Sequence, residues 1–102
     1  MTISRYELAL AVLDDLIAGP DDRSEEGLQW WDGELETVTG ESLKQWQNFR
    51  DRVAESGSLD NVETSLLHSA ALNVLGYPLI MPARVIAVGG NDWRNEVQQF
   101  LQ

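Results

Sequence analysis

The chain has 102 residues, no cysteine and a single histidine, His68. Without cysteine it can form neither a disulfide nor a thiolate zinc site, and one histidine cannot supply an imidazole pair to a transition metal. No apolar run approaches the roughly 18 residues of a membrane span, and Asp14 and Asp15 interrupt what would be the apolar region of a signal peptide. We therefore expect no cofactor, no metal and no membrane contact, and a soluble, cytoplasmic protein.

Basic residues are also scarce, with 7 lysines and arginines against 17 acids and a net charge of −10. The imbalance is local. Residues 14–41 hold ten acids and one base, Arg23, and carry −9, whereas all other residues together carry −1. Such a chain is repelled by nucleic acid and anionic lipid and attracted by basic protein surfaces.

An apolar fraction of 43% and helical spacing throughout predict one all-α domain over residues 1–102. We expect a compact bundle of five to six helices around a central helix at about residues 60–75. This segment, within residues 59–76, has two adjacent apolar stripes, which suit a helix with neighbours on several sides. Asp60 and Glu63 have the spacing of a capping box at its start, and Gly76 and Pro78 end it.

Three more helices are predicted before the central one. In residues 4–18, Ser4 and Glu7 have capping-box spacing. Ser24 caps the next helix, which extends to about residue 38, and a third spans about residues 41–55. The expected inward stripe of the first helix is Ile3, Tyr6, Leu10, Leu13 and Ile17, widened by Ala9, Val12 and Leu16. That of the second is Leu28, Trp31, Leu35 and Val38, with Trp30 beside it and partly exposed.

Residues 77–90 allow two interpretations. Pro82 suits the first position of a short helix, with Gly89 after its end, whereas Val85, Ile86 and Val88 equally suit a strand. We favour the helix because no other segment offers a strand partner. Asn91 or Asp92 then caps a last helix.

No catalytic motif is evident. His68 has no carboxylate three or four residues away, the acids lack the alternating pattern of a calcium loop, and Gly89-Gly90 precedes no phosphate-binding pattern. We therefore predict a protein without enzymatic activity.

The acids of residues 14–41 have two interpretations. They form either a solvated face that maintains solubility or a docking surface for a basic partner. Tryptophan among charges is typical of interface hot spots, which favours docking. The predicted partner-binding residues are Asp14, Asp15, Asp21, Asp22, Glu25, Glu26, Trp30, Asp32, Glu34 and Glu36.

These acids, with Trp30, give the chain a composition that resembles small protein inhibitors, including phage anti-CRISPR and anti-restriction proteins, bacterial immunity proteins and antitoxins. The resemblance implies a non-catalytic inhibitor that occupies a basic surface of a nucleic-acid-handling protein and does not itself bind nucleic acid. We favour an anti-CRISPR-type protein, which would act in the bacterial host cytoplasm if phage-encoded. A toxin-neutralising immunity protein or antitoxin is the alternative. The oligomeric state stays open.

A second, local resemblance covers residues 57–63, GSLDNVE, which look like the start of the recognition helix of acyl carrier proteins. It implies that Ser58 carries phosphopantetheine.

Mass spectrometry separates these hypotheses. For the favoured inhibitor we expect an unmodified chain after coexpression with a phosphopantetheinyl transferase. An added phosphopantetheine that is lost in Ser58→Ala would instead identify a carrier.

Overall fold

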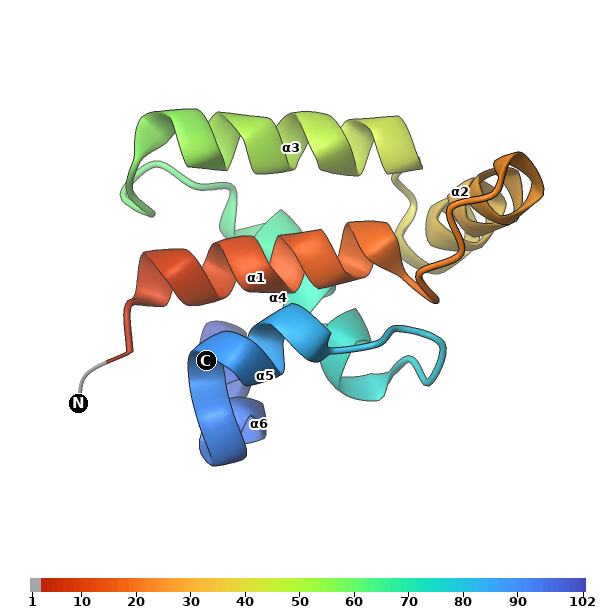
Figure 1. Ribbon diagram of the computed structural model, residues 1–102. Coiled ribbons are helices and arrows are strands. Elements are labelled where there is room, and N and C mark those ends of the chain that lie inside the picture. Colours follow the sequence, from red (N-terminus) through yellow and green to blue (C-terminus); the bar gives the residue numbers. More distant parts are fainter. Residues whose placement is uncertain (1–2) are drawn as a thin grey trace.

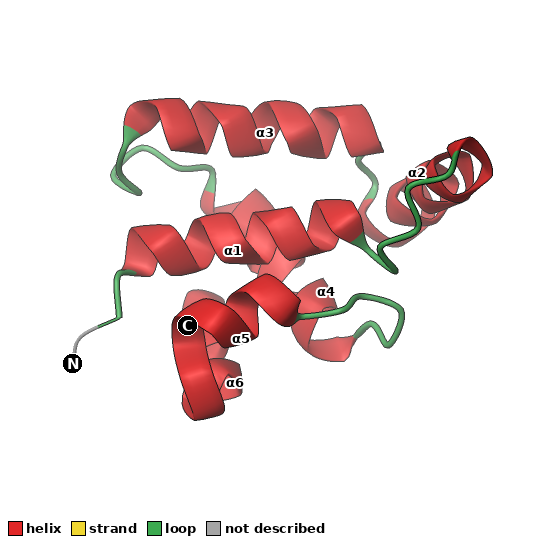
Figure 2. Cartoon of the chain, in the orientation of Figure 1, coloured by secondary structure: helices red, strands yellow, loops and turns green. Residues whose placement is uncertain are grey.

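The computed structural model describes residues 3–102, which contain helices and loops but no strand (Figure 2). The all-α prediction is therefore confirmed. The elements in chain order are α1 (Arg5–Ala18), α2 (Glu25–Thr39), α3 (Leu43–Ser56), α4 (Thr64–Gly76), α5 (Ala83–Gly89) and α6 (Trp93–Gln98), and the 3-10 turns Gly90–Asp92 and Gln99–Leu101 flank α6.

Helix α1 lies at the centre of the bundle. It packs against α3, α4 and α5, whereas α4 packs mainly against α1 and α6 (Figure 1). The expectation that the helix at about residues 60–75 is central is therefore wrong, because α1 packs closely against three α-helices and α4 against two. Its buried side chains are Leu8, Ala9, Ala11, Val12, Leu13, Asp15 and Leu16.

The buried face of α1 is centred on Val12, not on the stripe that the spacing predicted. Tyr6, Leu10 and Ile17 are only partly buried. The physical reason is that the buried face of α1 includes Asp15, a charged residue. A prediction from apolar residues alone leaves Asp15 out and therefore misplaces the centre of this face. Leu13 belongs to the core as predicted.

Serine caps position the first three helices, and two of these caps are as predicted. The Ser4 hydroxyl accepts a hydrogen bond from Glu7 N, and the Ser24 hydroxyl accepts one from Gly27 N. Each satisfies a backbone N–H that the first helical turn leaves free. Ser42 caps α3 in a full capping box with Gln45.

Helix α4 begins at Thr64, so the predicted start at Asp60 is wrong. Glu63 is the N-cap residue but makes no side-chain cap bond. Asp60 instead lies in a turn in which its N–H donates to the Ser58 hydroxyl at 3.4 Å, because short polar side chains offer the backbone an alternative to the helix. The carrier resemblance implies that Ser58 lies at the start of a helix. In the structure Ser58 lies instead in the loop between α3 and α4.

Residues 77–90 contain a helix, α5, as predicted, and its start is held by Asp15. The Asp15 carboxylate is completely buried. It accepts hydrogen bonds from Val85 N at 2.9 Å and from Arg84 N and the Arg84 guanidinium at 3.2 Å each. The free N–H groups at the start of α5 thus find a charged acceptor inside the protein, which joins α5 firmly to α1.

This arrangement predicts that Asp15→Asn destabilises the fold by about 3 kcal/mol, because the amide NH₂ would face N–H donors in a buried site. Urea unfolding measures the loss. Asp14→Asn is the matched control: it breaks the partly exposed Asp14–Arg50 ion pair of 2.9 Å and should cost about 1 kcal/mol or less. Equal losses in the two variants would contradict the role assigned to Asp15.

Candidate functional site

The structure divides the ten predicted partner-binding residues into those used within the fold and those left on the surface. Asp14 forms an ion pair with Arg50, and Asp15 is buried beneath α5. The prediction that Asp15 belongs to an exposed docking surface is therefore wrong, because its side chain is completely buried and both carboxylate oxygens accept from α5 or Arg84.

Two more of these acids hold α2 in place. An Asp32 carboxylate oxygen accepts a hydrogen bond from Leu43 N at 2.8 Å, at the start of α3. The Tyr77 hydroxyl donates to the Glu34 carboxylate at 2.5 Å. This bond holds the Tyr77 proton, and the nearby negative charge opposes its loss, so the pKa of Tyr77 is raised. Tyr77 was not among the predicted residues, since it lies 43 positions from its partner.

Trp31 is the apolar anchor of α2 and is buried in the core, as predicted. Its indole N–H donates to Leu16 O at 2.9 Å, and its ring lies 5.8 Å from that of Tyr77. The ring packs directly on Gly19, where a Cβ would lie 2.2 Å from it, and the φ of Gly19 is +55°. Glycine is thus required at the end of α1 for both space and backbone conformation.

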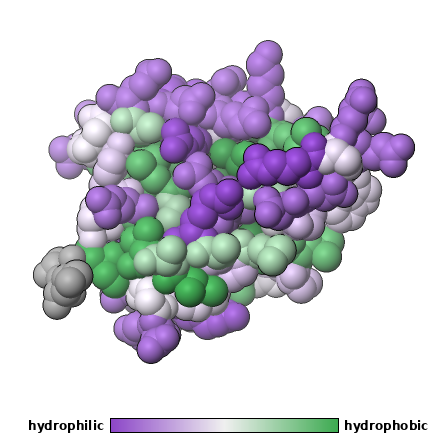
Figure 3. All heavy atoms as spheres, viewed as in Figure 1, coloured by the Kyte–Doolittle hydropathy of each residue, from purple (hydrophilic) through white to green (hydrophobic). Residues whose placement is uncertain are grey.

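The remaining acids are exposed and lie in α2 and the turn before it: Asp21, Asp22, Glu25, Glu26 and Glu36. We call these five residues the acidic surface of α2. Helix α2 contains no lysine or arginine, and the one base of the turn, Arg23, pairs with Asp21 at 3.5 Å. Glu25, Glu26 and Glu36 have no ion-pair or hydrogen-bonding partner for their carboxylates within residues 3–102. In Figure 3 the end of the molecule that carries α2 is largely hydrophilic.

Asp22 has a structural role as well. Its carboxylate accepts hydrogen bonds from the hydroxyl of Ser24 at 2.7 Å and from Ser24 N at 3.0 Å. These bonds stabilise the charged form and lower the pKa of Asp22. Asp22 therefore stays ionised while it orders the start of α2.

Apolar side chains are exposed among these acids. Trp30 is 49% exposed, in agreement with the prediction of a partly exposed side chain. Leu28 and Val38 were expected to face inward but are also exposed. The reason is that α2 projects from the end of the bundle (Figure 1) and contacts α3 only lightly, so Trp31 and Leu35 are the large side chains that reach the core.

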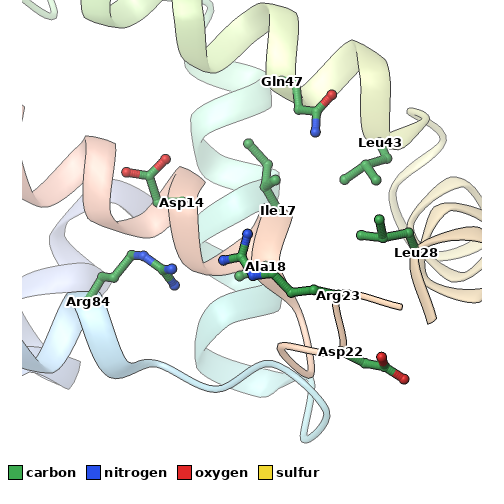
Figure 4. A pocket seen from close by; sticks show the side chains of 9 residues that line it. All are labelled: Asp14, Ile17, Ala18, Asp22, Arg23, Leu28, Leu43, Gln47 and Arg84. Carbon is green, nitrogen blue, oxygen red and sulfur yellow. The ribbon is translucent and has the colours of Figure 1, made fainter. Parts of the chain in front are cut away.

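A hollow of about 220 Å³ lies where α1, α2 and α3 meet. Leu28 and Leu43 face each other across it, and the side chains of Arg23 and Arg84 point toward it (Figure 4). Its charged lining residues are Asp14, Asp22, Arg23 and Arg84, so two negative and two positive side chains balance. The hollow therefore favours neither an anionic nor a cationic ligand.

Metal-ligating side chains do not gather within residues 3–102: no three of His, Cys, Asp or Glu are placed to hold an ion. His68 is exposed on α4. None of the helices described has the length and apolarity needed to cross a membrane. No protein-family model, curated protein or solved structure matches the chain.

The Glu34–Tyr77 bond makes stability sensitive to alkaline pH. Because the folded pKa of Tyr77 is raised above its ordinary 10.0, its contribution is complete below pH 10.0 and is lost as pH rises through the folded value. We expect the stability difference between wild type and Tyr77→Phe, measured by urea unfolding, to shrink above pH 10.0. Glu34→Gln should lower the Tyr77 pKa, as followed by phenolate absorbance. An unchanged titration in Glu34→Gln would contradict this assignment.

Proposed function

We propose that this protein is a non-catalytic inhibitor that uses α2 to occupy a basic, nucleic-acid-binding surface of a partner protein. The acidic surface of α2 carries the proposal: its carboxylates are exposed in and before a helix without any base. Carboxylates on the outer side of a projecting helix can contact the lysines and arginines that otherwise bind phosphates.

The distribution of charge supports binding over solubility alone. A surface on which positive and negative side chains alternate is sufficient for solubility. The rest of the chain has such a mixture, with ion pairs such as Arg52–Glu63 and Arg5–Glu96. Like charges gathered on α2 repel one another in the free protein. A basic partner would relieve this repulsion, speed the encounter and make binding depend on salt.

Trp30 adds an apolar contact to this surface. A half-exposed tryptophan beside carboxylates is the composition of an interface hot spot, and in the free protein its exposed ring costs hydration free energy.

The alternative function, neutralisation of a toxin, would use the same residues. The identity of the captured partner therefore distinguishes toxin neutralisation from the anti-CRISPR-type inhibition that we favour.

The test compares two triple variants with equal changes in net charge. Glu25→Gln, Glu26→Gln and Glu36→Gln remove the three unpaired charges of the acidic surface, whereas Asp51→Asn, Glu55→Gln and Asp60→Asn remove three exposed acids elsewhere. Wild-type protein first captures its partner at low salt from a lysate of the organism that encodes the chain. We expect the α2 variant to bind the purified partner about tenfold more weakly with a flatter salt dependence, and the control to bind as wild type does.

The same partner then enters a competition assay. Wild-type protein should displace DNA or RNA from it, and the α2 variant should require a higher concentration. Circular dichroism verifies that both variants keep their helices. Displacement by neither protein, or equal binding by the α2 variant, would refute the proposal.

A further inference from the structure

Exposed apolar side chains gather at the end of the molecule that carries α2. Seven large ones are exposed within residues 3–102. Five of them belong to α2 or to the loop that connects α4 to α5: Leu28, Trp30, Val38, Leu79 and Met81. This loop, residues 77–82, lies at the same end of the bundle as α2 (Figures 1 and 2).

Contacts at both ends of this loop hold it near α2. At one end Tyr77 bonds to Glu34 and lies beside the ring of Trp31. At the other end Met81 N donates to Gly19 O at 3.1 Å, at the residue on which Trp31 packs. The loop and α2 are therefore parts of one surface.

The two flanks of α2 differ. The flank with Leu28 and Asp32 faces α3, because Asp32 accepts from Leu43 N, and Leu28 on it lines the hollow of mixed charge. The other flank faces the loop, because Glu34 on it bonds to Tyr77. Residues four apart on a helix are neighbours, so this flank presents one row in which acids and apolar residues alternate: Glu26, Trp30, Glu34 and Val38.

Bases are absent from this surface. Neither α2 nor residues 77–83 contain lysine or arginine. Three arginines outside these segments are engaged with other groups. Arg23 pairs with Asp21 and Arg84 with Asp15, while the guanidinium carbon of Arg94 lies 4.5 Å from the ring of Trp93. The surface is thus apolar and negative together.

We infer that this row of α2 and residues 77–82 form one docking surface for a basic amphipathic segment of a partner protein. The inference rests on the proposed function, shares Glu26 and Trp30 with it, and adds the loop residues 77–82 to the surface that contacts the partner. Apolar side chains of the segment would lie against Trp30, Leu79 and Met81. Its lysines or arginines would pair with Glu26 and with Oε1 of Glu34, the carboxylate oxygen that does not accept from Tyr77. Nucleic acid does not fit, because phosphates and carboxylates repel. A second copy would bring two base-free surfaces together and is opposed by the same repulsion.

Two peptides of equal composition probe this surface. One is a helix-forming peptide of leucine and lysine with all leucines on one face, and the other has the same residues in scrambled order. Affinities are measured by titration calorimetry, and amide chemical shifts map the site. We expect the amphipathic peptide to bind about tenfold more tightly than the scrambled one and to shift the signals of both α2 and residues 77–82.

The chain offers a matched pair of variants. Leu79→Ala with Met81→Ala truncates side chains that are 42% and 56% exposed, and Leu72→Ala with Ile86→Ala truncates side chains that are 54% and 44% exposed on α4 and α5. The loop variant should bind the amphipathic peptide about tenfold more weakly, and the control variant should bind it as wild type does.

The outcomes separate this inference from the proposed function. Equal binding of the two peptides, or binding of the amphipathic peptide by the loop variant as tightly as by wild type, would show that the loop has no role. The inference would then be overturned. The proposed function would still stand if the α2 variant loses binding to the partner. If neither peptide binds, the inference is overturned as well. The proposed function is overturned separately, by equal binding of wild type and the α2 variant to the captured partner or by failure to displace nucleic acid from it.

Discussion

The enclosure of α1 by α3, α4 and α5 is the constraint on which the rest of the structure depends. It places Asp15 in the interior, where an unpaired carboxylate would be strongly unfavourable. The start of α5 and the side chain of Arg84 satisfy this charge. One buried carboxylate therefore determines where α5 begins and, with it, where the preceding loop passes over the end of α1.

Helix α2 is held from one side only. Trp31 inserts beside Gly19, Asp32 contacts the start of α3, and Glu34 accepts from Tyr77. These contacts leave the opposite side of α2 to solvent, and the unpaired acids lie there. These anchoring contacts matter for the function that we propose, because they hold a charged surface outward. A partner that binds it need not order a flexible segment, which keeps the entropic cost of association low.

Much of the fold was predictable because its signals are local. Ser4 and Ser24 mark helix starts through bonds to residues three positions away, and Pro82 precedes the short helix α5. The start of α4 was missed because Asp60 and Glu63 have the right spacing for a capping box, but the Ser58 turn provides a competing local bond. The exposure of Leu28 and Val38 was also missed, since the helical period says which residues share a face but not how far a helix extends beyond the core.

The sequence by itself determined that the protein is all-α, where most helices lie, and that the negative charge is concentrated in residues 14–41, because periodicity, caps and charge are properties of neighbouring residues. Only the tertiary structure decided which carboxylates are available: Asp15 is buried, whereas Glu25, Glu26 and Glu36 are exposed. It also joined residues 77–82 to α2. The physical reason is that Asp15 meets Val85 and Glu34 meets Tyr77 across 70 and 43 positions, and contacts over such distances leave no pattern in the local sequence.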